Sequence, residues 1–399
     1  MTSIALPLDR LRNPARTVAW VGIALGLLAA FVALPPIAVR SWIPSVLLGL
    51  AAVAAGIVAL TRGERRFGWY AIATAVLGFG LAYLATRSGI GKLEIVVVWS
   101  ALFASMLRFA TPLIFGALGG MFSERAGIVN VGLDGMMLMG AFFGIMAADK
   151  LDSWALGLAV GVLSGGAMAL LHAVWSVHFR ADQVISGVAI NFLAYGLTGY
   201  LFIDIYGQEG TPTDIPAIPN VRLAFIDDVP FFGDIFGNLN LMIWVALLLV
   251  PLSWLVLFRT PLGLRLRAVG EHPRAADTVG IDVYAMRYGA VVVSGMLAAA
   301  GGAYLSIGFV GSFNENMTDF RGFIALAAVI FGNWRPFGAA AACLLFGFSS
   351  ALAQRLPEYS GSAATLFQAL PYVLTLIAVA GVIGRSIPPA AVGRPYQKQ

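Results

Sequence analysis

The feature that most constrains this chain is a series of apolar runs, each about 18 to 25 residues long, separated by short polar loops. An α-helix of that length crosses the ~30 Å hydrocarbon core of a membrane and satisfies its own backbone hydrogen bonds in lipid. Hydrophobic residues make up 59% of the 399 positions and charged residues only 11%, which is more apolar surface than a water-soluble fold can bury. The sequence therefore predicts an all-α, polytopic transmembrane helical bundle.

The apolar runs place about ten to twelve segments in the membrane. Residues 94–107 are apolar too, but joining them to the next run would put Arg108 near the bilayer centre, where a charge costs ~3 kcal/mol. We therefore expect an interfacial helix that ends at Arg108. The candidate spans are 17–39, 42–60, 69–86, 109–123, 126–148, 154–178, 184–205, 240–258, 286–308, 322–332, 338–354 and 366–384.

The loops differ in charge between the two sides. If the spans alternate, the side of the N-terminus receives about twice as many basic residues as the other side. This bias predicts that both termini are cytoplasmic and that the chain is a multi-pass protein of the cytoplasmic (inner) membrane. The net charge of +5 is scattered over these loops, so it forms no basic stripe for nucleic acid.

The residues that usually carry catalysis or metals are sparse. Cys343 is the one cysteine and lies in an apolar run, and His172, His178 and His272 are too far apart to suggest a metal cluster. The sequence has no Walker A motif and no Ser-His-Asp arrangement. We expect no metal, no cofactor and no enzymatic activity in this chain.

Polar residues interrupt two of the apolar stretches. Glu124, Arg125, Asn130 and Asp134 fall between two runs among glycines, a pattern that transporters use to present polar groups to a substrate. The alternative is an ordinary cytoplasmic turn with a Glu124–Arg125 pair in water. Asn191 lies well inside a later span, where it either lines the pathway or hydrogen-bonds between helices.

Two long loops carry further signals. Residues 206–239 are acidic and rich in proline, which suits an external lid or docking surface, or equally a solvated connector. The basic loop 259–287 contains a short helix signal that starts at Pro273 and stops at Gly280. Such a short helix is marginal alone, so it needs another surface to hold it.

Four stretches of the sequence resemble a known family when they are taken together. They are FSERAGIVNVGLDGMML (122–138), ADQVISG (181–187), LRAVGEHPRAADTVGI (266–281) and GFIALAAVIFGNWRPFG (322–338). In this order they resemble permeases of the ribose-type, type II ABC importer family, closest to the nucleoside branch served by basic-membrane-protein lipoproteins. The resemblance covers about residues 95 to 385 and implies the type II importer permease fold.

The resemblance also implies a division of the chain. Residues 1–92 look like an added N-terminal unit of about three spans, 93–388 like the permease core, and 389–399 like a cytoplasmic tail. Asp134 stands where the family often has Glu, and His272 where Asn is common.

In the family, the loop that matches Glu271 to Gly280 is the coupling helix, which docks in a groove of a cytoplasmic ATPase. The turn from Asn333 to Gly338 is a weaker candidate for the same interface. The residues expected to serve this coupling are Arg267, Glu271, His272, Arg274, Ala275, Ala276 and Gly280.

The implied function is that of a permease subunit that translocates nucleosides. Its implied partners are a sister permease in a heterodimer, an ATPase that binds ATP and Mg²⁺, and an extracytoplasmic substrate-binding lipoprotein. Asn130, Asn191 and the Glu124–Arg125 region would suit ribosyl hydroxyls and a base edge, with Phe192 available for stacking. The alternatives are a simple-sugar permease, a proton-coupled secondary transporter that uses Glu124 or Asp134, and a scaffold that transports nothing.

Overall fold

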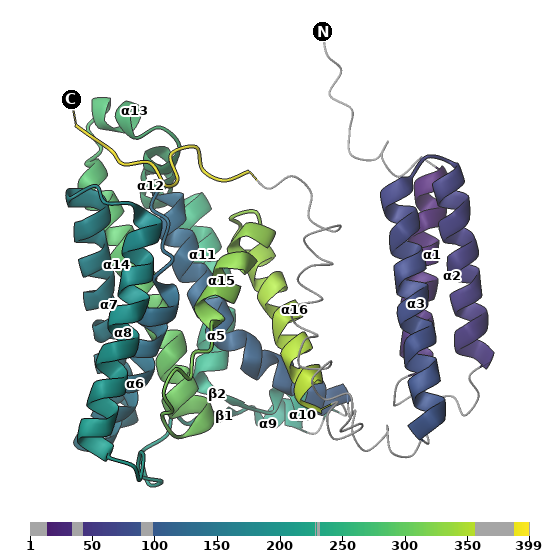
Figure 1. Ribbon diagram of the computed structural model, residues 1–399, viewed down its shortest axis with the longest axis horizontal. Helices are drawn as coiled ribbons and strands as arrows, with labels where there is room; N and C mark the ends of the chain where they lie inside the picture. Colours follow the sequence, from purple (N-terminus) through teal and green to yellow (C-terminus); the bar gives the residue numbers. More distant parts are fainter. Residues whose placement is uncertain are drawn as a thin grey trace. The chain divides into compact units, whose positions relative to one another are not determined.

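The computed structural model describes residues 14–33, 43–88, 99–227, 229, 232–355 and 387–398 (Figure 1). The chain divides into two compact units, Met1–Phe103 with Ala351–Val382, and Ala104–Ser350 with Ile383–Gln399. The expected span at 366–384 lies outside the described residues.

The first unit contains three helices that pack on one another, as the sequence predicts: α1 (Pro14–Ala33), α2 (Ile43–Thr61) and α3 (Arg65–Ser88). Small residues allow this packing. A side chain at Gly26 would overlap Thr74, and one at Gly56 would lie 2.9 Å from the Gly68 carbonyl oxygen. Close approach at small residues is the usual way in which helices associate in membranes.

The second unit is a bundle of long helices with short elements at its two ends. Within the described residues of the whole chain, seven helices are long and apolar enough to cross a membrane. The long elements of the bundle are α5 (Trp99–Arg125), α6 (Leu133–Leu151), α7 (Trp154–Ala173) with the π-helical turn η2 (Val174–His178), α8 (Gln183–Tyr206), α11 (Leu241–Arg259), α14 (Val283–Ala303) with η3 (Tyr304–Val310), α15 (Arg321–Phe331) and α16 (Pro336–Arg355).

The expected break at Arg108 is wrong, because α5 runs through it without interruption. Pro112 has no N–H to donate to the Arg108 carbonyl, and the Tyr304 hydroxyl donates to that carbonyl instead, at 3.4 Å. Arg108 is exposed and lies about 25 Å along the helix from Arg125. The helix therefore continues past Arg108 with the side chain of this residue exposed on its surface.

One end of the bundle is formed by the loop 206–239. Two short strands, β1 (Asn220–Arg222) and β2 (Asn238–Asn240), pair antiparallel with Asn220 opposite Asn240. Between them lie the short helices α9 (Ala224–Asp227) and α10 (Phe232–Phe236). Asn240 fixes the loop to the bundle, since its amide donates to the carbonyl oxygens of Ile218 and Gly308 at 2.9 and 3.2 Å.

The other end carries two short helices, α12 (Pro261–Glu271) and α13 (Pro273–Thr278), beside the C-terminal residues (Figure 1). The sequence predicted α13 but not α12, although Thr260 and Pro261 are start signals. The Thr260 hydroxyl accepts from the Gly263 N–H at 3.2 Å, and Pro261 occupies the first turn.

The centre of the bundle is formed by α6, α7 and α14, whose backbones meet at glycines. A side chain at Gly140 would lie 2.2 Å from the Ala299 carbonyl oxygen, and one at Gly302 would lie 1.8 Å from the Met137 carbonyl oxygen. Gly119 of α5 allows a similar approach, since a side chain there would lie 2.5 Å from the Ser294 carbonyl oxygen of α14. The helices that hold the polar residues are therefore in fixed, close contact.

Replacing Gly140 with alanine is expected to destabilise the fold, because the added methyl group would overlap the backbone of α14. Overpacking of this kind costs roughly 1–3 kcal/mol. Gly196→Ala in α8 is the matched control, since a methyl group there meets no atom within 4 Å. Thermal unfolding of the detergent-solubilised chain should show a lower midpoint for Gly140→Ala alone, and equal midpoints for the two variants would contradict the close packing.

Candidate functional site

The polar residues singled out in the sequence surround a non-helical stretch, residues 126–132, which we call the connecting segment. It joins the end of α5 to the start of α6. Gly127 has φ +90°, a conformation that favours glycine, and the Ser123 hydroxyl donates to the Ile128 carbonyl at 2.7 Å. Most of the segment is buried, so its backbone N–H and C=O groups need partners from the protein.

Side chains from α7 and α8 supply several of these partners. The Gln183 side-chain oxygen accepts from the Val129 N–H at 2.7 Å, and His172 Nε2 lies 3.2 Å from the Val129 carbonyl oxygen. Because a carbonyl can only accept, Nε2 carries the proton, and His172 Nδ1 then accepts from the Ser186 hydroxyl at 2.9 Å. His172 and Gln183 thus hold the connecting segment in place.

Asn191 reaches both the connecting segment and the first turn of α6. Its Nδ2 donates to the Val131 carbonyl at 3.0 Å, and its Oδ1 accepts from the Gly135 N–H at 2.7 Å. The Gly135 N–H is one of the donors that have no partner within a helix, so Asn191 caps α6 from the side. Of the two interpretations of Asn191, the interhelical hydrogen bond is therefore present.

Asp134 lies where two helices begin. Its Oδ1 accepts from the Gly322 N–H at 2.8 Å, and its Oδ2 accepts from the Thr318 hydroxyl at 3.1 Å. The carboxylate is thus in the first turn of α6 and beside the first turn of α15, where helix dipoles favour negative charge. A side chain at Gly322 would lie 2.3 Å from the Asp134 backbone nitrogen, so only glycine allows this approach.

Glu124 and Arg125 both bind Trp334, in the turn between α15 and α16. The Trp334 indole donates to the Glu124 carboxylate, and Arg125 donates from Nε and Nη2 to the Trp334 carbonyl at 3.1 and 2.7 Å. Glu124 is buried, so the simple solvated turn with a Glu124–Arg125 pair is wrong. Trp334 was not singled out from the sequence. It could have been identified by its indole N–H, which needs a hydrogen-bond partner when the ring is buried.

Asn130 differs from its neighbours because part of its hydrogen-bonding capacity is unused. Its Nδ2 donates to the Ser294 hydroxyl at 2.9 Å, whereas its Oδ1 has no hydrogen-bond partner among the described residues. The side chain is fully buried beside the connecting segment. Phe192, by contrast, is 73% exposed on α8 and does not join the polar group.

The residues expected to couple to an ATPase lie on α12, α13 and the turn after them. Arg267 is half-buried with its guanidinium 5.0 Å from the centre of the Phe258 ring, and Ala276 is buried. Val279 is 74% exposed. It was not singled out from the sequence, although an apolar residue at the end of a short polar helix could have identified it. The exposed members of the expected set are Glu271, His272, Arg274, Ala275 and Gly280.

Within the described part of the chain, no three His, Cys, Asp or Glu residues come together in a way that could hold a metal ion. The side chains around the connecting segment interact with it and with one another through hydrogen bonds.

Comparison with known proteins gives a consistent set of relatives. A family model described as "Branched-chain amino acid transport system / permease component" matches residues 102–379. The guanosine ABC transporter permease protein NupQ of Bacillus subtilis is 41% identical over 316 residues, which cover 77% of this chain and 99% of that protein. The nucleoside ABC transporter permease protein NupC of Lactococcus lactis is 40% identical over 320 residues, 77% of this chain and 98% of that protein.

Two further relatives bear on cargo and assembly. The "Putative glucose ABC transporter permease protein TsgC13" of Haloferax volcanii is 37% identical over 265 residues, 65% of this chain and 79% of that protein. A second guanosine permease of Bacillus subtilis, NupP, is 26% identical over 278 residues, 66% of this chain and 78% of that protein. Relatives of this chain thus occur as paired permeases. No solved structure gives a significant match.

Replacing Asp134 with alanine is expected to cost roughly 1–3 kcal/mol, because the Gly322 N–H and the Thr318 hydroxyl lose their acceptor. Asp134→Asn is the matched control, since its oxygen can still accept from Gly322 and its amide can donate to the Thr318 hydroxyl. Thermal unfolding should place the asparagine variant closer to the native chain than the alanine variant. Equal losses would show that the charge matters and the hydrogen bonds do not.

Proposed function

This chain belongs to the family of branched-chain amino acid transport system permease components, and we propose that it forms half of a pore that imports nucleosides. The observation that carries the proposal is that two relatives about 40% identical over almost their full lengths are named as guanosine and nucleoside permeases. Permeases of this family are transport components and not enzymes. The glucose permease matches over less of its length, which makes a sugar the alternative cargo.

We propose that the second half of the pore is a sister permease, as the paired relatives suggest. ATP and Mg²⁺ bind to a separate ATPase in the cytoplasm, and a lipoprotein delivers the nucleoside from outside. In this arrangement the chain lies in the cytoplasmic membrane with both termini in the cytoplasm. The basic residues of the α12–α13 end, such as Arg265 and Arg274, support this orientation through the positive-inside rule.

The opposite end of the bundle has a hollow that would suit the external lipoprotein. It has a volume of about 590 Å³ and is lined by residues of the loops after α8 and after η3, among them Glu209, Thr211 and Glu315. The Phe313 N–H donates to the Thr211 hydroxyl at 3.2 Å and joins the two loops. This supports the expectation that the start of the 206–239 loop belongs to a docking surface.

The proposed cargo pathway follows the connecting segment. Nucleosides carry hydroxyl groups and base edges that need hydrogen-bond partners, and Asn130 offers an unused buried acceptor. Asn191, Glu124 and Arg125 already bind other parts of the protein, so they would contact cargo only after rearrangement. The exposed ring of Phe192 would meet cargo if the α8 face lines the pore between the two permeases.

The ATPase would dock on α13 and on the turn that follows it. One side of this short helix is fixed to the protein through buried Ala276, and the other side presents Ala275, Val279 and Gly280. An exposed valine beside small residues is suited to insertion into a groove of a partner. The charged residues Arg274 and Glu271 lie around this patch and would form its polar rim.

Transport by the reconstituted complex tests the cargo directly. Proteoliposomes with this chain, the sister permease, the ATPase and the lipoprotein should take up labelled guanosine only when ATP is supplied. Unlabelled nucleosides should compete, and glucose and ribose should not. Competition by sugars alone would establish the alternative cargo, and uptake driven by a pH gradient without the ATPase would show a secondary transporter.

Replacing Val279 with arginine is expected to weaken ATPase association at least about tenfold, because a charge would have to be buried in the docking groove. The side chain is 74% exposed, so the fold of the permease should not change. Phe225→Arg is the control, because Phe225 is 77% exposed at the opposite end of the bundle. Pull-down of the ATPase by each variant measures the effect, and equal recovery with Val279→Arg would place the docking site elsewhere.

A further inference from the structure

The C-terminal residues 387–398, which we call the tail, lie across the α12–α13 end of the bundle (Figure 1). The Ile387 N–H donates to the Asn333 side chain at 3.1 Å, and the Ala390 N–H donates to the Glu271 carboxylate at 3.1 Å. The Ala391 N–H then donates to the Gly270 carbonyl at 2.9 Å. The tail therefore starts at the turn before α16 and crosses the end of α12.

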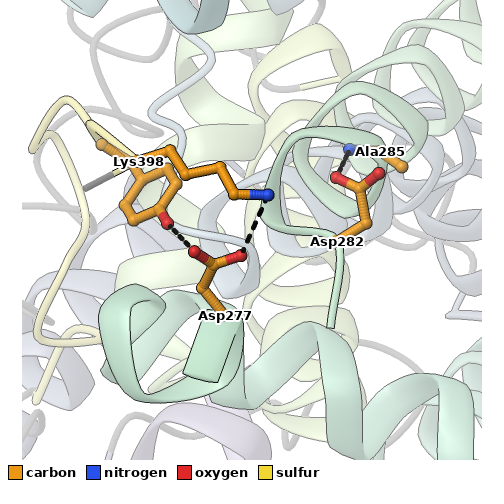
Figure 2. A network of polar contacts seen from close by, with 5 residues as sticks. Asp277, Asp282, Ala285 and Lys398 are labelled. Atoms are coloured by element: carbon orange, nitrogen blue, oxygen red, sulfur yellow. Dashed lines mark hydrogen bonds and ion pairs between the residues drawn. The ribbon is translucent and has the colours of Figure 1, made fainter. Parts of the chain in front are cut away.

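The far end of the tail binds α13. The Tyr396 hydroxyl donates to the Asp277 carboxylate at 2.8 Å, and the Lys398 ammonium lies 3.8 Å from its other oxygen (Figure 2). The Tyr396 ring packs against Val269 and Ala276 in a small apolar cluster. Burial and the adjacent Asp277 raise the pKa of Tyr396 to about 12, so the hydroxyl remains a donor at physiological pH.

The middle of the tail binds the connecting segment and α14. The Gly393 N–H donates to the Gly127 carbonyl at 3.2 Å, and Arg287 of α14 donates to the Arg394 carbonyl at 3.3 Å. Gly127 is crowded, because a side chain there would lie 3.0 Å from Arg287 Nη2 and 3.2 Å from the Ala391 carbonyl oxygen. The tail, the connecting segment and α14 thus meet with no space between them.

We propose that the tail links α13, the connecting segment at Gly127 and α14, so that the three move together. We call this role a brace, and Tyr396 is its positioning residue. The proposal rests on the proposed docking of the ATPase at α13. A helix of six residues cannot transmit a force unless it is held on the side away from its partner, and Tyr396 holds it there. Movement of α13 then reaches the connecting segment through Gly393 and Gly127.

The brace can be distinguished from a tail that only covers apolar surface, because the two predict different effects on complex assembly, ATP hydrolysis and transport. If the tail only covers apolar surface, removing the Tyr396 ring lowers the amount of assembled complex and lowers hydrolysis and transport in proportion. If the tail is a brace, the ATPase still binds through the exposed patch of α13 and still hydrolyses ATP. What falls is the amount of cargo moved for each ATP, because movement of α13 no longer reaches the connecting segment through the tail.

The experiment uses the full complex in proteoliposomes, with guanosine as cargo, and measures ATPase association, ATP hydrolysis and uptake together. With Tyr396→Ala we expect association within about twofold of the native complex and a fall of about tenfold in guanosine moved per ATP, a change that coupling residues can produce. Tyr396→Phe, which removes only the hydroxyl, should give a smaller fall in the same ratio. Gln397→Ala is the control, since Gln397 is exposed on the tail and its ratio should not change.

An unchanged ratio in both Tyr396 variants would overturn the brace. If Tyr396→Ala does not assemble, Tyr396→Phe alone decides between the two outcomes. The proposed docking site is tested separately by Val279→Arg. If that variant loses the ATPase while the Tyr396 variants keep the native ratio of guanosine moved per ATP, the brace is wrong and the proposed function stands. If the native complex moves glucose and not guanosine, the cargo is wrong, and the same ratio measured with glucose still tests the brace.

Discussion

The buried, non-helical backbone between α5 and α6 is the constraint on which the polar interior of the bundle depends. Peptide groups that leave a helix within a membrane protein need partners from the protein, because lipid offers none. His172, Gln183 and Asn191 provide them from two neighbouring helices. These polar residues therefore lie inside an apolar bundle because the connecting segment is there, and a pathway along it would use side chains that already stabilise the fold.

The same segment contacts the tail at one end and continues into α6 at the other. At Gly127 it contacts the tail and Arg287, and at Gly135 it has become the first turn of α6, where Asp134 reaches the start of α15. The α12–α13 end also contacts α5 directly, since a side chain at Gly270 would lie 2.0 Å from the Arg125 carbonyl oxygen. Close backbone contacts of this kind leave little room for the α12–α13 end and the connecting segment to move independently.

Much of the fold and the family could be predicted from the sequence because membrane helices are encoded locally. Length and hydropathy give the spans, and the start and stop signals at Pro273 and Gly280 give α13. The four stretches that resemble ribose-type permeases lie inside the matched range 102–379, and membership of a permease family is confirmed. The polar residues gathered around the connecting segment were also identified, because such residues stand out in an apolar sequence.

The partners of those residues could not be predicted, since each lies far away along the chain. A buried carboxylate at Glu124 implies a donor, but nothing local identifies Trp334, which lies 210 residues away. The donor to the Arg108 carbonyl is distant in the same way, since Tyr304 lies 196 residues from Arg108. The local sequence does not show which group donates to the Arg108 carbonyl that Pro112 leaves without its helical donor. Local sequence thus specifies which groups need a partner, and the packing of distant helices determines which partner they find.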